Sequence, residues 1–376
     1  MRATAVQLTP IVILFGRVGD MIMLTAALDL LHRRYGRPCH VIGAGSWNRD
    51  LYRGHPDVDQ CWNLPRHLPF ASTLEWTAVV RTLRRTAPAP IYIPEAMPRQ
   101  VARIKRLLAI SGIDPQRCVL LDEEPCQSEH YVDVLLRLAA RTPPALEAAG
   151  YRAPGTLCLP RLVTLEAEQA RCEELLRQRG WKDRPLVVIH PGTRRTMSAR
   201  SRKRWRADND RSWPVARWRA LLHAFRARHP HAVIVLQGAP SELPYLRELH
   251  AAIGLDGLEI AAFRLRMSFT LMAAAESMIS MDTGMAHAAA ALGLPVVVIM
   301  GANPQSRVLP RSAAGSAVIG VGGPPQFTRA DQIPVEAVFD AWHALSARCA
   351  AARGAARSGA LPAPPVSTSA AVAGET

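Results

Sequence analysis

A short polar turn near the C-terminal end of the sequence has the residue types that bind an anion. Asp282-Thr283-Gly284 follows an apolar strand pattern and opens a small-residue helix expected over 285–292, with Gly293 as its stop. The first-turn amides of such a helix lack intrahelical partners and lie at the positive end of the helix dipole, so they favour a phosphate. His287 falls in that turn, either as a donor to a phosphate oxygen or leaving group, or as an ordinary satisfied histidine.

A second turn of similar chemistry follows the strand pattern at 185–190. Gly192 allows the backbone to approach a ligand closely, Thr193 offers a hydroxyl and Arg194 offers a cation. These three groups together could hold a diphosphate.

The stretch 195–211 is dense in arginine. A charge run of this kind is by default a solvated, disordered loop. Its last residue, Arg211, is the exception, because Trp213-Pro214 starts the next helix and holds Arg211 beside the ordered fold.

Two carboxylates stand at the carboxyl ends of expected strands. Asp20 follows the strand pattern at 11–15 and a glycine turn, and Glu242 follows the pattern at 231–238. Open α/β sheets bind ligands at this edge, so Asp20 could act on a substrate, and Glu242 could accept the two hydroxyls of a ribose. Each is about equally well placed as a capping or first-turn acid of the helix that follows.

Short apolar strands alternate with helices along most of the chain, which predicts an α/β fold with doubly wound, mostly parallel sheets. At 376 residues the chain is too long for one ordinary core, and a segment rich in Pro, Gly and Ala at 142–160 indicates a linker. We expect an N-terminal domain at 1–150, a C-terminal domain at 151–351, and a disordered tail rich in Ala, Pro and Ser at 352–376.

The formal net charge of +15 indicates a polyanionic partner or environment. A phosphorylated substrate, an anionic membrane surface and nucleic acid all fit this charge, as does a surface that simply uses arginine as its cation; no familiar nucleic-acid module accompanies it. The seven cysteines form no CxxC pair, which favours reduced thiols without a zinc site. With no convincing secretory signal or membrane span, we expect a cytoplasmic protein, with peripheral contact at the inner face of the cytoplasmic membrane compatible with its charge.

Four motifs in a fixed order carry a resemblance to a known family. They are Ile-His-Pro-Gly-Thr-Arg at 189–194, Arg-Ser-Trp-Pro-Val-Ala-Arg-Trp at 211–218, Gly-Ala-Pro-Ser-Glu at 238–242 and Asp-Thr-Gly-Met-Ala-His at 282–287. With Gly19-Asp20 they make the chain resemble glycosyltransferase family 9, the heptosyltransferases of lipopolysaccharide synthesis. One of these motifs alone would be weak, whereas four in order are specific.

The resemblance implies a GT-B fold, in which two Rossmann-like domains face each other, with the nucleotide-sugar donor on the C-terminal domain and the acceptor largely on the N-terminal one. It makes Asp20 the general base, with Arg17 nearby as an acceptor contact, and it makes Glu242 the ribose ligand. The remaining donor-binding residues that it implies are Thr193, Arg194, Arg211, Asp282, Thr283, Gly284 and His287. The family usually has lysine just before the Trp-Pro pair, where this chain has Arg211, and the two side chains differ in hydrogen-bond geometry.

The reaction so implied is inverting transfer of a heptose or related sugar from an ADP-sugar to a hydroxyl of a lipopolysaccharide core or a similar phosphorylated acceptor. It needs a base on the attacking hydroxyl and compensation for the charge that grows on the departing diphosphate. Protein cations and helix amides can supply that compensation, so we expect no obligatory metal and no other cofactor.

Other interpretations stay open at this point. The acceptor could instead be a protein glycosylated in the cytoplasm, as by an autotransporter-type heptosyltransferase. A catalytically silent GT-B protein would bind a nucleotide-sugar without consuming it. A nucleic-acid-binding protein would use the 195–211 stretch and show steep salt dependence.

Overall fold

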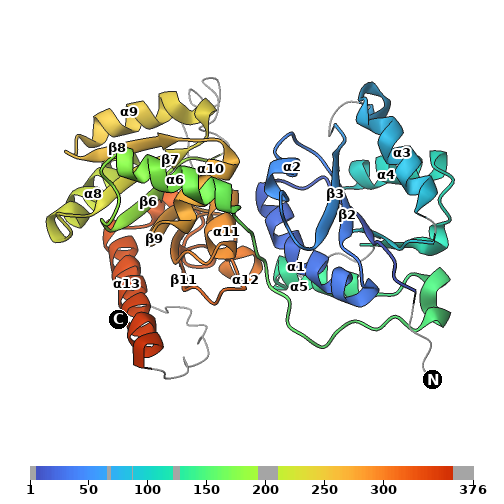
Figure 1. The fold of residues 1–376 in the computed structure, drawn as a ribbon. Coiled ribbons are helices and arrows are strands. Elements are labelled where there is room, and N and C mark those ends of the chain that lie inside the picture. The colour runs from blue at the N-terminus through green and yellow to red at the C-terminus, as the bar shows by residue number, and fades with distance from the viewer. Residues whose placement is uncertain (1–5, 66–68, 87, 122–127, 194–210, 359–376) are drawn as a thin grey trace.

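The computed structural model describes residues 6–65, 69–86, 88–121, 128–193 and 211–358, which build two parallel sheets with helices packed around them (Figure 1). The first sheet has the strand order β3-β2-β1-β4-β5, and the second has the order β11-β10-β9-β6-β7-β8. Each pair of neighbouring strands runs parallel. The predicted α/β class is confirmed.

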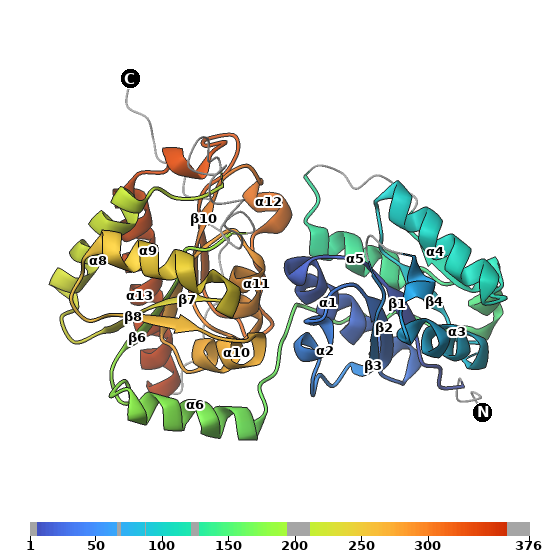
Figure 2. The same ribbon diagram turned by 90° about the horizontal axis from the view of Figure 1, so that it is seen from above.

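The first sheet and its helices come from the N-terminal part of the chain. Its strands are β1 (Ile11–Ile13), β2 (Cys39–Gly43), β3 (Val58–Asn63), β4 (Ile91–Ile93) and β5 (Cys118–Leu120). Its helices are α1 (Val18–Tyr35), α2 (Asn48–Leu51), α3 (Glu75–Arg85), α4 (Pro98–Ile110) and α5 (Tyr131–Ala140), with short 3₁₀ turns at Phe70–Ser72, Pro115–Arg117 and Pro144–Ala149. Figures 1 and 2 show α1, α2 and α5 on the side of the second domain, and α3 and α4 on the side turned away from it.

The second sheet follows the helix α6 (Glu166–Gln178). Its strands are β6 (Leu186–His190), β7 (Val233–Gly238), β8 (Leu258–Ala262), β9 (Ser277–Met281), β10 (Val296–Met300) and β11 (Val318–Gly322). The other helices are α8 (Val215–Arg228), α9 (Leu243–Ile253), α10 (Leu265–Ala273), α11 (Gly284–Ala291), α12 (Gln305–Val308) and α13 (Val335–Ser358), with 3₁₀ turns at Pro240–Glu242 and Ala330–Gln332. The last helix continues to Ser358, so residues 352–358 of the tail that was expected to be disordered are helical, and residues 359–376 lie outside the described residues.

The central strands are buried on both faces, as the sequence pattern requires for a sheet covered by helices on both sides. Every residue of β1, β2, β4, β6, β7, β9 and β10 is buried. The strands β5, β8 and β11 were not predicted. They lie at sheet edges. The strands β8 and β11 have partly exposed side chains and a mixed sequence pattern, and β5 has only three residues, too few for a clear pattern.

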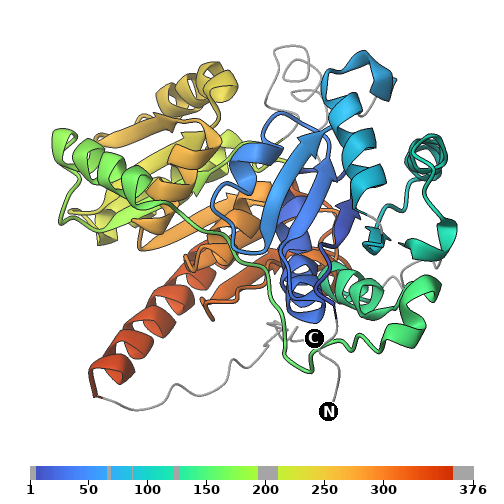
Figure 3. The same cartoon turned by 45° about the vertical axis from the view of Figure 1, so that its right-hand side comes forward.

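The segment that leads into α6 crosses from the first domain to the second, and Figure 3 shows it in green beside the first sheet. Arg161 ties this segment to the first domain, because its backbone N–H donates to Thr25 Oγ1 at 3.0 Å and its guanidinium contacts Asp57 at 2.7 Å. The next residue bonds to the second domain, since Leu162 N–H donates to the carbonyl of Ala291 at 2.9 Å. The crossing segment is therefore fixed to both domains.

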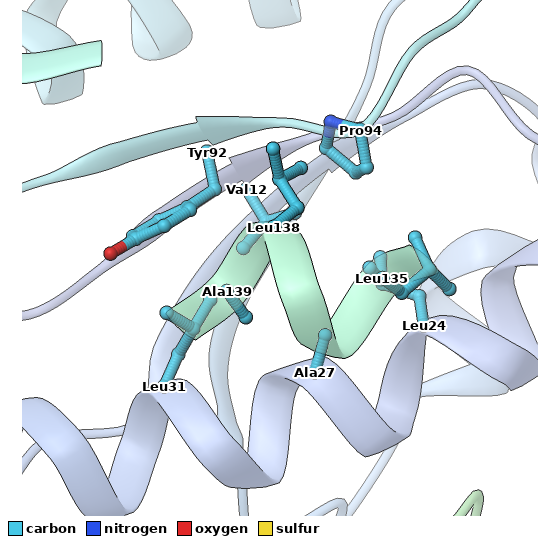
Figure 4. Close-up of a pocket in the computed structure, with 9 residues that line it drawn as sticks. All are labelled: Val12, Leu24, Ala27, Leu31, Tyr92, Pro94, Leu135, Leu138 and Ala139. Atoms are coloured by element: carbon cyan, nitrogen blue, oxygen red, sulfur yellow. The ribbon is translucent and has the colours of Figure 1, made fainter. Parts of the chain in front are cut away.

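A small apolar cavity lies between α1, α5 and the first sheet (Figure 4). Its volume is about 10 Å³, the room that a single water needs, but the lining lacks the polar partners that would hold one. The lining residues are Val12, Leu24, Ala27, Leu31, Tyr92, Pro94, Leu135, Leu138 and Ala139. We regard the cavity as a packing gap within the core.

The two domains touch where the first turns of α1 and α11 meet. A Cβ atom on Gly284 would lie 2.9 Å from the backbone nitrogen of Gly19 and 2.9 Å from Val18 Cβ. Both distances are too short for a carbon contact, and one of the two atoms belongs to the backbone. Glycine at 284 is thus required for the two helices to approach this closely.

Replacing Gly284 with alanine is expected to separate these helices and to destabilise the protein by about 1–3 kcal/mol, the usual cost of forcing a methyl group into a packed contact. Thermal unfolding should show this as a lower midpoint. Gly155→Ala is the matched control, because a Cβ there would meet nothing within 4 Å. An unchanged midpoint for Gly284→Ala would show that the helices do not pack this closely.

Candidate active site

The turns that carry Asp20, Thr193 and Asp282 lie at the points where the strand order of each sheet reverses. In the second sheet the order reverses between the neighbours β6 and β9, which lead into Thr193 and into the Asp282-Thr283-Gly284 turn. In the first sheet it reverses between β1 and β4, and β1 leads into Asp20. Loops diverge at such points and leave a crevice, where α/β sheets bind ligands. The topology therefore places Asp20, Thr193 and the Asp282-Thr283-Gly284 turn at the sheet edges where such folds bind ligands, and Glu242 follows β7, the strand next to β6.

The first turn of α11 has an unused hydroxyl. Thr283 is the N-cap residue of this helix, yet its side chain makes no capping hydrogen bond. Thr283 Oγ1 is buried and has no hydrogen-bond partner within the described part of the chain. A buried hydroxyl without a partner costs free energy, so its presence beside the helix amides indicates a bound group that would pair with it.

The side chain of Asp282, the first residue of this turn, is held by a hydrogen bond. Asn303 Nδ2 donates a hydrogen bond to Asp282 Oδ2 at 2.7 Å. Burial raises the pKa of Asp282, while the bond from Asn303 and the positive charge of Arg211 lower it. The structure thus brings Arg211 within electrostatic range of the α11 turn.

His287 lies one turn into α11 and is 6% exposed. Burial, together with the charge of His130, lowers the pKa of its imidazole to about 4, although the charge of Asp20 acts in the opposite direction. The neutral imidazole is therefore the form present at neutral pH. A neutral ring has one N–H to donate and one nitrogen to accept.

Asp20 caps α1 in the free protein. Its Oδ2 accepts a hydrogen bond from the backbone N–H of Arg17 at 2.7 Å. Asp20 therefore acts as a capping carboxylate, as the sequence allowed. The cap uses Oδ2, which is one of the two carboxylate oxygens. Asp20 also lies close enough to His287 to affect its pKa, so the two domains bring these predicted residues together. The side chain of Arg17 is exposed at the start of the same helix.

Glu95 was missed by the sequence reasoning. It is 4% exposed and follows β4, beside Asp20 at the same sheet edge. Its two oxygens accept hydrogen bonds from Phe15 N–H at 3.2 Å and Met97 N–H at 3.1 Å. Glu95 therefore ties the turn that carries Asp20 to the turn after β4. Its position directly after a strand, the same signal as for Asp20, would have identified it.

The turn after β6 is held by its neighbours on the second domain. Thr193 is buried, and its Oγ1 lies 3.4 Å from Ser212 Oγ, next to Arg211. Tyr245 donates to the carbonyl of Pro191 at 3.4 Å. This arrangement keeps the Thr193 hydroxyl beside Ser212, the residue that follows Arg211 in the chain.

Glu242 is buried at the carboxyl edge of β7, and its Oε2 accepts a hydrogen bond from Ala239 N–H at 2.9 Å. Like Asp20, it serves as an acid of the first turn, and it lies at the sheet edge where α/β folds bind ligands. The predicted residue Arg194 and most of the basic stretch, 195–210, lie outside the described residues.

Two further contacts hold the domains together on the side of α5. His130 Nε2 lies 2.9 Å from the carbonyl of Leu309. Arg311 donates to both oxygens of Asp133, at 2.5 and 2.9 Å. These bonds and the α1–α11 contact fix the two crevices relative to each other, which a reaction between two substrates requires.

The described residues hold no group of three or more His, Cys, Asp or Glu side chains arranged to bind a metal ion. Within the same ranges, none of the helices combines the length and the apolar character needed to cross a membrane.

Comparison with known proteins agrees with this geometry. The model of glycosyltransferase family 9 (heptosyltransferase) matches residues 124–332. No curated protein matches the chain.

Several solved structures share the fold. ADP-heptose LPS heptosyltransferase II of E. coli is 19% identical, with a TM-score of 0.67 over 90% of this chain and 98% of that one. A glycosyltransferase family 9 protein of Veillonella parvula is 15% identical, with a TM-score of 0.69 over 91% and 98%. E. coli heptosyltransferase WaaC with ADP is 16% identical, with a TM-score of 0.61 over 88% and 98%. The predicted GT-B architecture is confirmed by these likenesses.

The buried neutral state of His287 predicts a pH dependence of stability. Its folded-state pKa of about 4 lies below the ordinary 6.5, so the unfolded chain binds the proton first and stability is lost as the pH falls from about 6.5 towards 4. Between pH 7 and about pH 5, the free energy of unfolding should fall by about 2 kcal/mol more in the native protein than in His287→Gln.

Urea unfolding at the two pH values measures this difference. The buried His55 and His130 contribute to the loss in both proteins and therefore cancel. His231→Gln, at an exposed position, is the control that should keep the native slope. Equal slopes in His287→Gln and the native protein would contradict a buried neutral imidazole.

Proposed function

Because the chain belongs to glycosyltransferase family 9, and is therefore a glycosyltransferase, we propose that it transfers a heptose or a related sugar from an ADP-sugar to an acceptor hydroxyl with inversion. The observation that carries the proposal is the first turn of α11. There the buried Thr283 hydroxyl, which has no hydrogen-bond partner among the described residues, lies beside helix amides that favour a phosphate. The fold similarity to a heptosyltransferase solved with ADP supports the choice of nucleotide.

The donor would lie along the carboxyl edge of the second sheet. Its diphosphate would accept hydrogen bonds from the α11 amides, Thr283 and Thr193, with Arg211 supplying a positive charge. Glu242, buried at the carboxyl edge of β7, would accept the ribose hydroxyls, because the two oxygens of a carboxylate match a vicinal diol. The spacing of these groups over the neighbouring strands β9, β6 and β7 suits an extended nucleotide.

The chemical step would begin at Asp20. Its carboxylate takes the proton of the acceptor hydroxyl as that oxygen attacks the anomeric carbon, and the bond from this carbon to the diphosphate breaks. The electron pair of that bond leaves with ADP. The negative charge that develops there is stabilised by the helix amides, Arg211 and a hydrogen bond from neutral His287. Attack from the side opposite the leaving group inverts the anomeric configuration.

These groups would neutralise the leaving diphosphate with protein atoms alone, and we therefore propose that transfer needs no divalent metal and no other cofactor. For the acceptor we propose a lipopolysaccharide core or a similar phosphorylated glycolipid. Exposed Arg17, at the start of α1 and beside Asp20, would meet its anionic groups. Such an acceptor implies a cytoplasmic enzyme that works at the inner face of the cytoplasmic membrane.

The base role of Asp20 is tested by Asp20→Asn. Asparagine can still accept the Arg17 N–H, so the helix cap and the fold should persist, whereas proton removal should fail. Turnover is expected to fall by about 10²–10⁴-fold, with little change in ADP affinity measured by calorimetry. Unchanged turnover on a competent acceptor would remove Asp20 from the mechanism. Donor binding with no turnover by the native protein on any acceptor would favour a silent binding protein.

The nucleotide site is tested by calorimetric titration with ADP, UDP and GDP. ADP should bind more tightly than the other two. Thr283→Val should weaken ADP binding by about tenfold or more, since a hydrogen bond to a charged group contributes about 1.5–3 kcal/mol. The same change should leave thermal stability nearly unaffected, because the hydroxyl has no protein partner to lose among the described residues. Equal ADP affinity in the two proteins would place the diphosphate elsewhere.

A further inference from the structure

The helices α3 and α4 lie on the side of the N-terminal domain that faces away from the second domain (Figures 1 and 2). Their exposed side chains make this surface basic. We define the α3–α4 surface by its exposed side chains. Its cations are Arg81, Arg84, Arg85, Arg99, Lys105 and Arg106, and its apolar members are Leu74, Met97 and Ile110.

The exposed charged side chains that define this surface are all positive. Between them the two helices contain one acidic residue, Glu75, which is half-buried and is bonded to Arg49 at 2.6 Å. Arg81 stands three and four residues from Arg84 and Arg85, so like charges are neighbours on one helix face, an arrangement that destabilises a helix. A surface that keeps such repulsion is suited to an anionic partner that relieves it.

The apolar side chains distinguish this surface from other basic parts of the molecule. Leu74 is 99% exposed, Met97 51% and Ile110 48%. Within the described residues, the other large apolar side chains that are exposed are Val6 and Leu157, near the N-terminus and in the segment before α6. The α3–α4 surface therefore combines cations with most of the exposed apolar side chains.

Two of these apolar residues lie at the edge of the sheet that carries the site. Leu74 immediately precedes α3, and Met97 immediately precedes α4. Both helices begin at the carboxyl edge of the first sheet, where Asp20 and Glu95 are found. A surface held by Leu74 and Met97 would thus lie next to the crevice of the N-terminal domain.

From this combination we propose that the α3–α4 surface docks on an anionic lipid bilayer. The cations match the phosphates of lipid headgroups, and Leu74, Met97 and Ile110 reach into the boundary between headgroups and acyl chains. A soluble polyanion would pair with the cations but would leave the apolar side chains in water. Docking needs neither donor nor acceptor, so this proposal goes beyond the proposed transfer reaction and does not rest on it.

The test uses the full-length protein and sedimentation with vesicles of phosphatidylcholine, alone or mixed with phosphatidylglycerol. The native protein should bind the mixed vesicles and bind the neutral ones weakly. Arg81→Glu with Lys105→Glu should lower the partition coefficient by about tenfold or more. The matched control is Arg219→Glu with Arg228→Glu on the basic helix α8, which makes the same change in net charge at two exposed positions. It should change binding by less than about twofold.

The variant Leu74→Gln distinguishes binding to a bilayer from binding to a soluble polyanion. It should lower vesicle binding severalfold and leave binding to heparin unchanged, because heparin offers charge without an apolar layer. Equal losses in the two double variants, or no loss from Leu74→Gln, would overturn the proposal. Thermal unfolding and ADP titration of each variant show that the fold and the donor site are intact, so failure of docking and failure of the proposed reaction remain distinguishable.

Discussion

The close approach of α1 and α11 at Gly19 and Gly284 is the constraint on which the rest of the site depends. Each of these helices begins at the point where the strand order of its own sheet reverses. Joining the two first turns brings the acid of one domain towards the phosphate-type turn of the other. It also buries His287 under the opposite domain, and this burial keeps the imidazole neutral. A methyl group at either glycine would therefore change both the relative position of the two helices and the environment that keeps His287 neutral.

The carboxylates of the site have two roles that do not exclude each other. Asp20 and Glu242 each accept a backbone N–H at the start of the helix that follows. Capping restrains each carboxylate at the sheet edge. Sequence reasoning set the capping role against a role with a substrate, but a carboxylate has two oxygens and the two roles are compatible.

Much of this arrangement was predictable because it is local in the sequence. Apolar runs locate the central strands, and the residues directly after them, Asp20, Thr193 and Asp282, fall at the ligand edge. The edge strand β8 was missed because its apolar and polar residues neither alternate regularly nor form a continuous apolar run. His130 and Arg311 could not be identified, since their importance comes from contacts between residues far apart in the chain. The expected domain boundaries and the role of Arg194 stay predictions.

Amide hydrogen exchange, with and without saturating ADP, tests the central claim most directly, since it reports on the backbone groups said to hold the diphosphate. Slower exchange in the first turn of α11, at Met285, Ala286 and His287, and in the turn that contains Thr193 is the result that the account predicts. ADP that saturates the protein by calorimetry and leaves both turns unchanged would contradict it, and the residues protected instead would show where the nucleotide binds.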